Sequence, residues 1–147
     1  EGLFNILENV YVDFEVSPTA LDLFAGTGSI GLELASRGCG KVVSVEKDFK
    51  HWQFLSRVQK ELQIKEWLPL KGDVFKYVHT CRVQYDIIFA DPPYALENLA
   101  DIPDVALPLL AEGGVFILEH GSSYDFSQHP RFVNHRNYGS VNFSFFQ

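Results

Sequence analysis

The sequence predicts an α/β fold in which a doubly wound, mostly parallel sheet of seven strands ends in an antiparallel C-terminal hairpin. Three observations favour this fold. Between residues 20 and 119, five short apolar segments alternate with segments of helical periodicity. A glycine-rich loop, residues 26–31, joins the first apolar segment to a helical one. After residue 131 the alternation ends, and two short segments meet at Tyr138-Gly139, which is typical of a hairpin.

Length and composition fit one folded domain over residues 1–147. The chain has 147 residues, of which 46% are hydrophobic. No apolar run approaches the roughly 18 residues that cross a bilayer, so we expect no membrane partner. Cys39 and Cys81 lack metal-ligand spacing, and we expect reduced thiols in a cytoplasmic protein. The net charge of -7 argues against a chain that holds nucleic acid by electrostatics alone.

The first element is a helix. Leu3, Ile6, Leu7 and Val10 recur at helical spacing and predict one buried face. The sequence opens without Met, at Glu1, and this helix begins abruptly. We therefore expect that an upstream N-terminal segment is missing from the sequence.

Alternating elements follow, and glycine or a capping aspartate marks most of their junctions. Glycines end the first strand and the helix after it, Asp48 caps the next helix, and residues 41–46 are rich in β-branched side chains. The predicted elements are strand 20–24, helix 29–37, strand 41–46, helix 48–62, strand 67–71 and helix 73–79.

The remaining elements complete the sheet. Residues 85–90 form a strand that the prolines of the following Asp-Pro-Pro-Tyr segment cannot continue. We expect a helix over 97–110, a turn at Gly113-Gly114 and a fifth strand at 115–119. Strands 132–138 and 141–146 form the hairpin, and the last strand is expected beside the fifth. Ligands of such sheets bind at the carboxyl ends of the strands.

The glycine-rich loop and a downstream acidic residue indicate a nucleoside cofactor. Gly26, Gly28 and Gly31 form G-x-G-x-x-G between a strand and a helix, and Glu46 lies twenty residues after Gly26. Three alternatives fit: a tight turn without ligand, a nicotinamide or flavin site, and an S-adenosylmethionine site. Asp22 favours the third, because its carboxylate would repel a pyrophosphate and attract the ammonium of a methionine.

A second acidic position supports the same cofactor. Asp73 follows the third strand, where it could accept a hydrogen bond from the adenine amine while Val74 packs on the ring. Asp73 could equally cap the next helix, and one residue can do both. The cofactor-binding residues expected on this basis are Asp22, Phe24, Gly26, Thr27, Gly28, Glu46, Lys47, Asp73 and Val74.

The tetrapeptide Asp-Pro-Pro-Tyr at residues 91–94 indicates methylation of an exocyclic amine. Asp91 and the carbonyl of Pro92 can each accept one amino hydrogen, which localises the nitrogen lone pair and stabilises the charge that develops there. Tyr94 offers a face on which an unstacked base can lie. We expect Asp91, Pro92 and Tyr94 to be catalytic. Without the other motifs, a rigid turn with an exposed tyrosine would explain the segment.

Few other residues indicate chemistry. Pro93, Tyr94 and Glu119 are expected to bind substrate, although a structural carboxylate explains Glu119 equally well. His120 is expected to be packed rather than catalytic. The remaining histidines are scattered without ligand geometry, so we expect no metal.

These motifs and their flanking segments resemble one family. Leu-Phe-Asn-Ile-Leu at 3–7, Leu-Asp-Leu-Phe-Ala-Gly-Thr-Gly at 21–28, the tetrapeptide at 91–94 and Tyr138-Gly139 before a Phe-rich strand are similar to the RsmD family of bacterial 16S ribosomal RNA guanine-N2 methyltransferases. The resemblance implies a Rossmann-like class I methyltransferase fold, S-adenosyl-L-methionine as cofactor and 16S ribosomal RNA as partner. It implies a monomer that acts on a small ribosomal subunit or an assembly intermediate. Family members usually carry a basic stretch before the first helix, which this sequence lacks.

Four other functions fit the sequence less well. An oxidoreductase offers no use for the Asp-Pro-Pro-Tyr segment. Adenine-N6 methylation of DNA or RNA is chemically similar, but a DNA enzyme usually carries an added recognition region. Glutamine methylation typically shows Asn in place of Asp91. A non-catalytic RNA-binding or assembly module is disfavoured by the acidic residues at all the expected positions.

Overall fold

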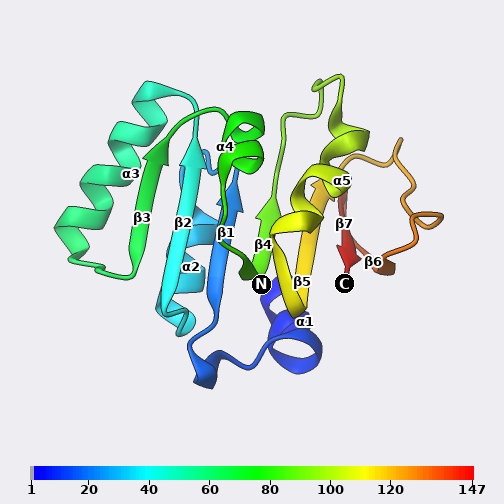
Figure 1. The fold of residues 1–147 in the computed structure, drawn as a ribbon, viewed down its shortest axis with the longest axis horizontal. Helices are drawn as coiled ribbons and strands as arrows, with labels where there is room; N and C mark the ends of the chain where they lie inside the picture. Colours follow the sequence, from blue (N-terminus) through cyan, green and yellow to red (C-terminus); the bar gives the residue numbers. More distant parts are fainter. Residues whose placement is uncertain (1) are drawn as a thin grey trace.

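A single mixed sheet organises residues 2–147, the part of the chain that the computed structural model describes (Figure 1). Its strands lie in the order β3-β2-β1-β4-β5-β7-β6. β1 to β5 pair in parallel, whereas β7 is antiparallel to both β5 and β6. The predicted seven-stranded sheet, with its last strand inserted beside the fifth, is confirmed. The strand bounds are β1 Thr19–Leu23, β2 Lys41–Glu46, β3 Trp67–Lys71, β4 Tyr85–Ala90, β5 Leu110–His120, β6 Phe132–Tyr138 and β7 Val141–Phe146.

Helices cover both faces of this sheet, so the central strands are buried on both sides. α1 (Gly2–Ile6), α2 (Ser29–Arg37) and α3 (Phe49–Leu62) share one hydrophobic core with the sheet. α4 (Val74–Thr80) and α5 (Ile102–Ala106) share a second core on the opposite face (Figure 1). Because both faces are covered, the residues of β1, β2 and β4 are almost continuously buried rather than alternately buried and exposed.

The helix predicted over residues 97–110 is wrong in its extent. The segment contains only a 3-10 turn (η3, Leu99–Asp101), the short α5 and a second 3-10 turn (η4, Leu107–Leu109). Proline explains the interruption, because Pro103 fits the first turn of α5 whereas Pro108 has no N–H to continue the helical ladder.

The turn predicted at Gly113-Gly114 is also wrong, because it lies inside a strand. β5 begins at Leu110 and pairs with β4 through a register shift. Gly113 adopts a positive φ of 81° in this irregular stretch. A Cβ at Gly114 would lie 2.5 Å from the Asp86 carbonyl oxygen, so close approach of the backbone requires glycine there.

The opening helix has a wider final turn than its periodicity predicts. Leu3, Ile6 and Leu7 are buried as expected, but Val10 is 63% exposed. Residues 7–11 form a π-helical turn (η1, Leu7–Tyr11), in which the Val12 N–H donates to the Leu7 carbonyl at 2.7 Å. The extra residue in this turn displaces Val10 from the buried face.

A short 3-10 turn, η2 (Phe14–Val16), leads from there into β1. Across residues 2–147, no helix combines the length and apolar character that crossing a membrane requires.

Candidate active site

A cavity of about 880 Å³ lies at the carboxyl ends of the parallel strands. It opens where β1 and β4 are neighbours, which is the point at which the chain reverses its direction across the sheet. The Asp91 N–H donates to the Leu23 carbonyl at 3.4 Å and joins the ends of these two strands. Most of the predicted site residues line this cavity: Asp22, Phe24, Gly26, Thr27, Glu46, Lys47, Asp73, Val74, Asp91, Pro92, Pro93, Tyr94 and Glu119.

The glycine loop is tied to the end of β2 by Glu46. One carboxylate oxygen of Glu46 accepts from the Gly26 N–H at 2.7 Å, and the other accepts from the Asp48 N–H at 2.9 Å. Gly26 has a φ of 58°, and a Cβ there would meet no atom within 4 Å. A side chain at Gly26 would therefore occupy the cavity itself, which glycine leaves open.

Gly28 is the predicted site residue that does not line the cavity. It precedes α2 with a φ of 80°, and a Cβ there would lie 2.2 Å from Leu55 of α3 and 3.0 Å from Trp67 of β3. The second glycine of the motif thus allows α2 to pack closely against its neighbours.

Asp22 forms the buried wall of the cavity. It is only 1% exposed, and its Oδ2 accepts from the Ser44 hydroxyl at 2.9 Å. Ser44 in turn accepts from the Trp67 indole N–H at 2.9 Å. No salt bridge to Asp22 forms within residues 2–147. Burial raises the pKa of Asp22 to about 7.

Asp73 serves as a helix cap and also reaches the cavity. Its carboxylate accepts from the Lys76 N–H at 3.1 Å and begins α4. Val74 is buried beside it, and Phe75 meets the ring of Phe24 edge-on at 6.2 Å. Phe24 has a φ of 59°, an uncommon conformation for an aromatic residue, directly where β1 enters the glycine loop.

The Asp-Pro-Pro-Tyr segment ends β4 and forms the opposite wall of the cavity. Asp91 is exposed there, Pro92 is buried, and Tyr94 is 53% exposed. The Leu96 N–H donates to the Pro93 carbonyl at 3.0 Å, which closes a tight turn around the tyrosine. The Tyr94 ring packs over Gly121, since a Cβ at Gly121 would lie 3.7 Å from it.

The cavity is strongly acidic. Its basic side chains are Lys47 and His51, against the carboxyl groups of Asp22, Glu46, Asp48, Asp73, Asp91 and Glu119. Partial desolvation of the carboxyl by the cavity walls raises the pKa of Asp91 to about 6. Burial, with a smaller contribution from Asp91, raises the pKa of Glu119 to about 7. Such a cavity favours a cationic ligand and repels a pyrophosphate.

His120 is packed beside the site. It is 1% exposed, its Nδ1 bonds the Gly121 carbonyl, and its Nε2 bonds the Ser144 hydroxyl, both at 2.8 Å. Burial lowers its pKa. Among residues 2–147, no cluster of three or more potential metal ligands occurs.

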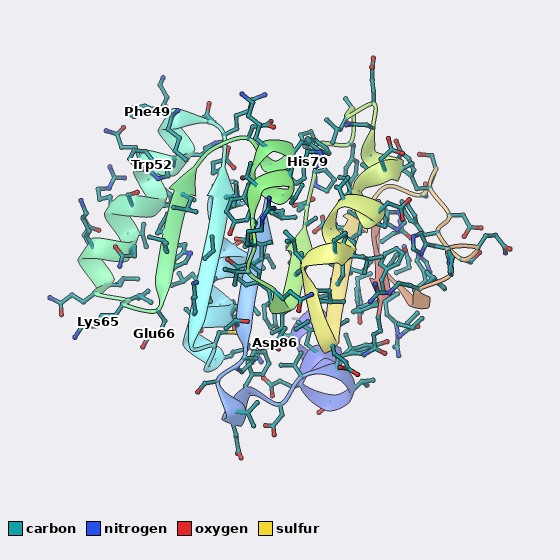
Figure 2. All side chains as sticks on the ribbon, viewed as in Figure 1. Phe49, Trp52, Lys65, Glu66, His79 and Asp86 are labelled. Carbon is teal, nitrogen blue, oxygen red and sulfur yellow. The ribbon has the colours of Figure 1, made fainter. Side chains whose placement is uncertain are left out.

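Several residues that line the cavity were not predicted from the sequence. Figure 2 shows Phe49 at the end of α3 where the strands of the sheet terminate. Phe49 directly follows the Asp48 cap, three residues after Glu46, and this position was the available signal, because an exposed aromatic side chain there lies at the same strand ends. The other unpredicted lining residues are Ala25, Ser29, Ile30, Asp48, His51, Phe75, Phe89 and Leu96.

Comparison with known proteins extends these observations. The family model described as conserved hypothetical protein 95 matches residues 1–147. YlbH of Bacillus subtilis, which is named as an rRNA methyltransferase, is 30% identical over 126 residues, 82% of this chain and 66% of YlbH. The ribosomal RNA small subunit methyltransferase D of Buchnera aphidicola is 30% identical over 94 residues, 64% of this chain and 46% of that protein.

A solved structure adds a ligand-bound neighbour. The Thermus thermophilus 16S rRNA N2 G1207 methyltransferase RsmC, in complex with AdoMet and guanosine, has a TM-score of 0.74 and 25% identity, covering 88% of this chain and 37% of that one. The chain spans about two thirds of YlbH and about half of the Buchnera protein. It belongs to the family described as conserved hypothetical protein 95, and its named homologues are rRNA methyltransferases.

Proposed function

We propose that the chain is the S-adenosyl-L-methionine-dependent methyltransferase domain of a protein that methylates the N2 amine of a guanine in 16S ribosomal RNA. The observation that carries this proposal is one acidic cavity that combines carboxylates from the ends of β1, β2 and β3 with the Asp-Pro-Pro-Tyr segment. RsmC, whose structure holds AdoMet and guanosine, has the same fold and supports this substrate pair.

The cavity residues fit this cofactor. Asp22 lacks a cationic partner among the described residues and suits the methionine ammonium. Each Glu46 oxygen accepts one backbone N–H and has a further lone pair for a ribose hydroxyl. Asp73, Val74 and Phe75 suit the adenine amine and ring. When bound, the cofactor supplies an electrophilic methyl group on a sulfonium, whose positive charge suits the acidic cavity.

Asp91 and Tyr94 are expected to activate the guanine amine and to position the base that carries it. An exocyclic amine of guanine is a weak nucleophile because its lone pair is delocalised into the ring. Asp91 and the Pro92 carbonyl would accept the two amino hydrogens and orient the lone pair toward the cofactor side of the cavity. Asp91 also stabilises the positive charge that develops on the nitrogen. The exposed Tyr94 ring provides a stacking face for a base that has left its own stack.

The position of Glu119 favours guanine over adenine as the substrate base. The Watson–Crick edge of guanine carries adjacent donors, N1–H and the N2 amine, whereas adenine presents an acceptor at N1. Asp91 and Glu119 line the same cavity and interact electrostatically. A pair of carboxylate acceptors matches the two guanine donors, and it would leave the adenine N1 facing an acceptor.

The RNA substrate is expected within a folded particle. The chain has a net charge of -7, so phosphate neutralisation contributes little to its affinity for RNA. A small ribosomal subunit or an assembly intermediate would present one unstacked guanine by shape, and a monomer suffices for this geometry.

Methylation of defined RNAs tests the proposal. Full-length protein is incubated with methyl-labelled S-adenosylmethionine and, separately, with naked 16S RNA and small subunits isolated from cells that lack the gene. We expect labelled N2-methylguanosine after digestion, and more of it from the particle. Label in N6-methyladenosine would replace the substrate assignment, and label in no RNA would contradict the proposal. Asp91→Ala protein is the matched control for contaminating activity.

A further inference from the structure

Four exposed lysines, the rim lysines, lie at the carboxyl ends of β2 and β3, on one side of the candidate active site. Lys47 directly follows β2 and lines the cavity, and Lys71 is the last residue of β3. Lys50 and Lys76 lie in the first turns of α3 and α4, the helices that follow these two strands. Because parallel strands end at the same edge of a sheet, the four lysines share the edge at which the cavity opens.

The rim lysines have no ion-pair partner in the part of the chain that the structure describes. Arg37, by contrast, pairs with both Glu8 and Glu33. The first turn of a helix favours acidic side chains, but after the Asp48 cap the first turn of α3 contains none and carries Lys50 instead. Neither ion pairing nor helix stability therefore explains why positive charge gathers at this edge.

Charge is divided between the two halves of the sheet. Nine of the twelve lysines and arginines lie in residues 41–82, which include β2, α3, β3 and α4. Residues 83–130, which include β4, β5 and the Asp-Pro-Pro-Tyr segment, contain eight aspartates and glutamates and no lysine or arginine. The two groups of strands lie on opposite sides of β1 (Figure 1). A polyanion would therefore be attracted to the β2–β3 side and repelled from the β4–β5 side.

A phosphate backbone is the anion that fits this arrangement. The proposed cofactor carries no phosphate, so it offers the rim lysines no such partner. Lysine binds phosphate as a point charge and needs no fixed geometry, which suits exposed and unpaired side chains. An RNA whose guanine stacks on Tyr94 brings further phosphates to the edge of the cavity, and the β2–β3 side is the one whose charge favours them.

We infer that the rim lysines contact phosphates of the RNA, so that the strand crosses the carboxyl ends of β2 and β3 while its guanine enters the cavity at β4. This inference rests on the proposed function. Phosphate contacts fix the position and direction of a nucleic acid without reading its sequence. Four such contacts are few beside the roughly 6–10 of proteins that bind nucleic acid mainly through phosphates, so they orient the RNA rather than supply most of its affinity.

The salt dependence of methylation tests this inference, because each phosphate contact releases counterions when it forms. Full-length protein is assayed over a range of KCl concentrations with naked 16S RNA and with small subunits from cells that lack the gene. The variants are Lys50→Gln, Lys71→Gln and Lys76→Gln, and Lys76→Arg keeps the charge. Lys47 is left unchanged because it is also expected to bind the cofactor. Lys65→Gln is the matched control, since Lys65 is exposed but lies before β3, at the opposite end of the sheet (Figure 2).

Each of the three rim variants that lose a charge should lower kcat/KM for RNA about fivefold at roughly 100 mM KCl. Each should also reduce the slope of log kcat/KM against log salt concentration by about 0.7–0.9. The kcat at saturating RNA, the affinity for S-adenosylhomocysteine and the melting temperature should be unchanged. Lys76→Arg and Lys65→Gln should behave as the wild type.

Three results would overturn the inference while methylation persists. The first is a salt slope in the rim variants that equals the slope of Lys65→Gln. The second is weaker S-adenosylhomocysteine binding in these variants, which would assign the lysines to the cofactor. The third is an effect on the small subunit without an effect on naked RNA, which would assign them to an acidic protein surface of the particle. Absence of methylation by wild-type protein would instead overturn the proposed function, and this inference with it.

Discussion

At the scale of single residues, the two walls of the cavity differ in how their side chains are held. Asp22 and Glu46 are held by fixed hydrogen bonds before any ligand binds, whereas Asp91 and Tyr94 are exposed to the cavity. We propose that groups of the first kind determine affinity for the cofactor. Groups of the second kind are then expected to meet the substrate and to act as the reaction proceeds.

Substitution of Asp91 should separate binding from chemistry. Asp91→Ala should leave the affinity for S-adenosylhomocysteine largely intact while kcat falls on the order of 10²–10⁴-fold, since its bond strengthens as the amine becomes cationic. Tyr94→Ala should raise KM and lower kcat through lost stacking, and Tyr94→Phe should be mild. Calorimetry and steady-state kinetics measure these effects. An Asp91→Ala enzyme with normal turnover would contradict the assigned role.

Glu119 should impose a pH dependence on guanine methylation. The carboxyl must be ionised to accept the guanine N1–H, and its pKa is raised to about 7. The kcat/KM should therefore rise as pH increases through about 7 and level off above it. Glu119→Gln should lose this part of the pH profile while retaining measurable methylation. A profile that is the same in the variant and the wild type would show that another group is responsible.

At the scale of elements, the turn between β1 and α2 depends on the end of β2. Glu46 accepts hydrogen bonds from backbone N–H groups of both the glycine loop and the residue before α3. It therefore fixes the relative positions of these two segments. A ligand that binds Glu46 would therefore affect the positions of both the glycine loop and α3.

Glu46→Ala should weaken S-adenosylhomocysteine binding by about 1.5–3 kcal/mol, because charge-assisted bonds to ribose hydroxyls are lost. Titration calorimetry measures this loss. Glu66→Ala is the matched control, since Glu66 lies at the opposite end of the sheet (Figure 2) and does not line the cavity. Stronger binding of NADH than of S-adenosylhomocysteine to wild-type protein would contradict the cofactor assignment.

The sequence was sufficient to predict the strand order at the C-terminal edge and the set of acidic residues that meet in the cavity. Strand ends converge once the alternation of strands and helices is known, so Asp22, Glu46 and Asp91 could be placed together. Motif spacing predicts that Gly28 binds the cofactor, whereas in the structure Gly28 lies outside the cavity lining and a Cβ there would meet Leu55 and Trp67. Such a contact between distant elements has no local pattern.

Other features differ in how far the sequence could predict them. The broken helix after residue 97 could have been predicted from Pro103 and Pro108, whose effect on the helical ladder is local. The left-handed conformation of Phe24 and a second, smaller cavity around Asn142 could not, because both depend on segments that are far apart in the sequence.

At the scale of the whole molecule, the buried Asp22 carboxyl makes the stability of the protein depend on pH. Asp22 is buried, and its pKa is raised from 3.8 to about 7. A carboxyl with a raised pKa binds more protons in the folded than in the unfolded state between these values. The free energy of unfolding therefore decreases as pH rises from about 4 to about 7 and is level above that range.

Thermal denaturation between pH 4 and pH 8 should show this loss. For Asp22 alone it amounts to at most about 4 kcal/mol. Asp22→Asn should reduce the slope because the side chain cannot ionise, while Glu61→Gln on the exposed surface should keep it. S-adenosylhomocysteine should raise the melting temperature of the wild type more than that of Asp22→Asn. If stability falls with pH equally steeply in Asp22→Asn and the wild type, folding does not shift the pKa of Asp22, which would contradict this prediction.

The central claim is that the protein methylates guanine N2 in 16S ribosomal RNA. Nucleoside mass spectrometry of 16S ribosomal RNA from cells with and without the gene tests it most directly. The account predicts that N2-methylguanosine falls by one residue per 16S molecule in the deletion, returns with the wild-type gene and does not return with Asp91→Ala. An unchanged N2-methylguanosine content in the deletion would contradict it.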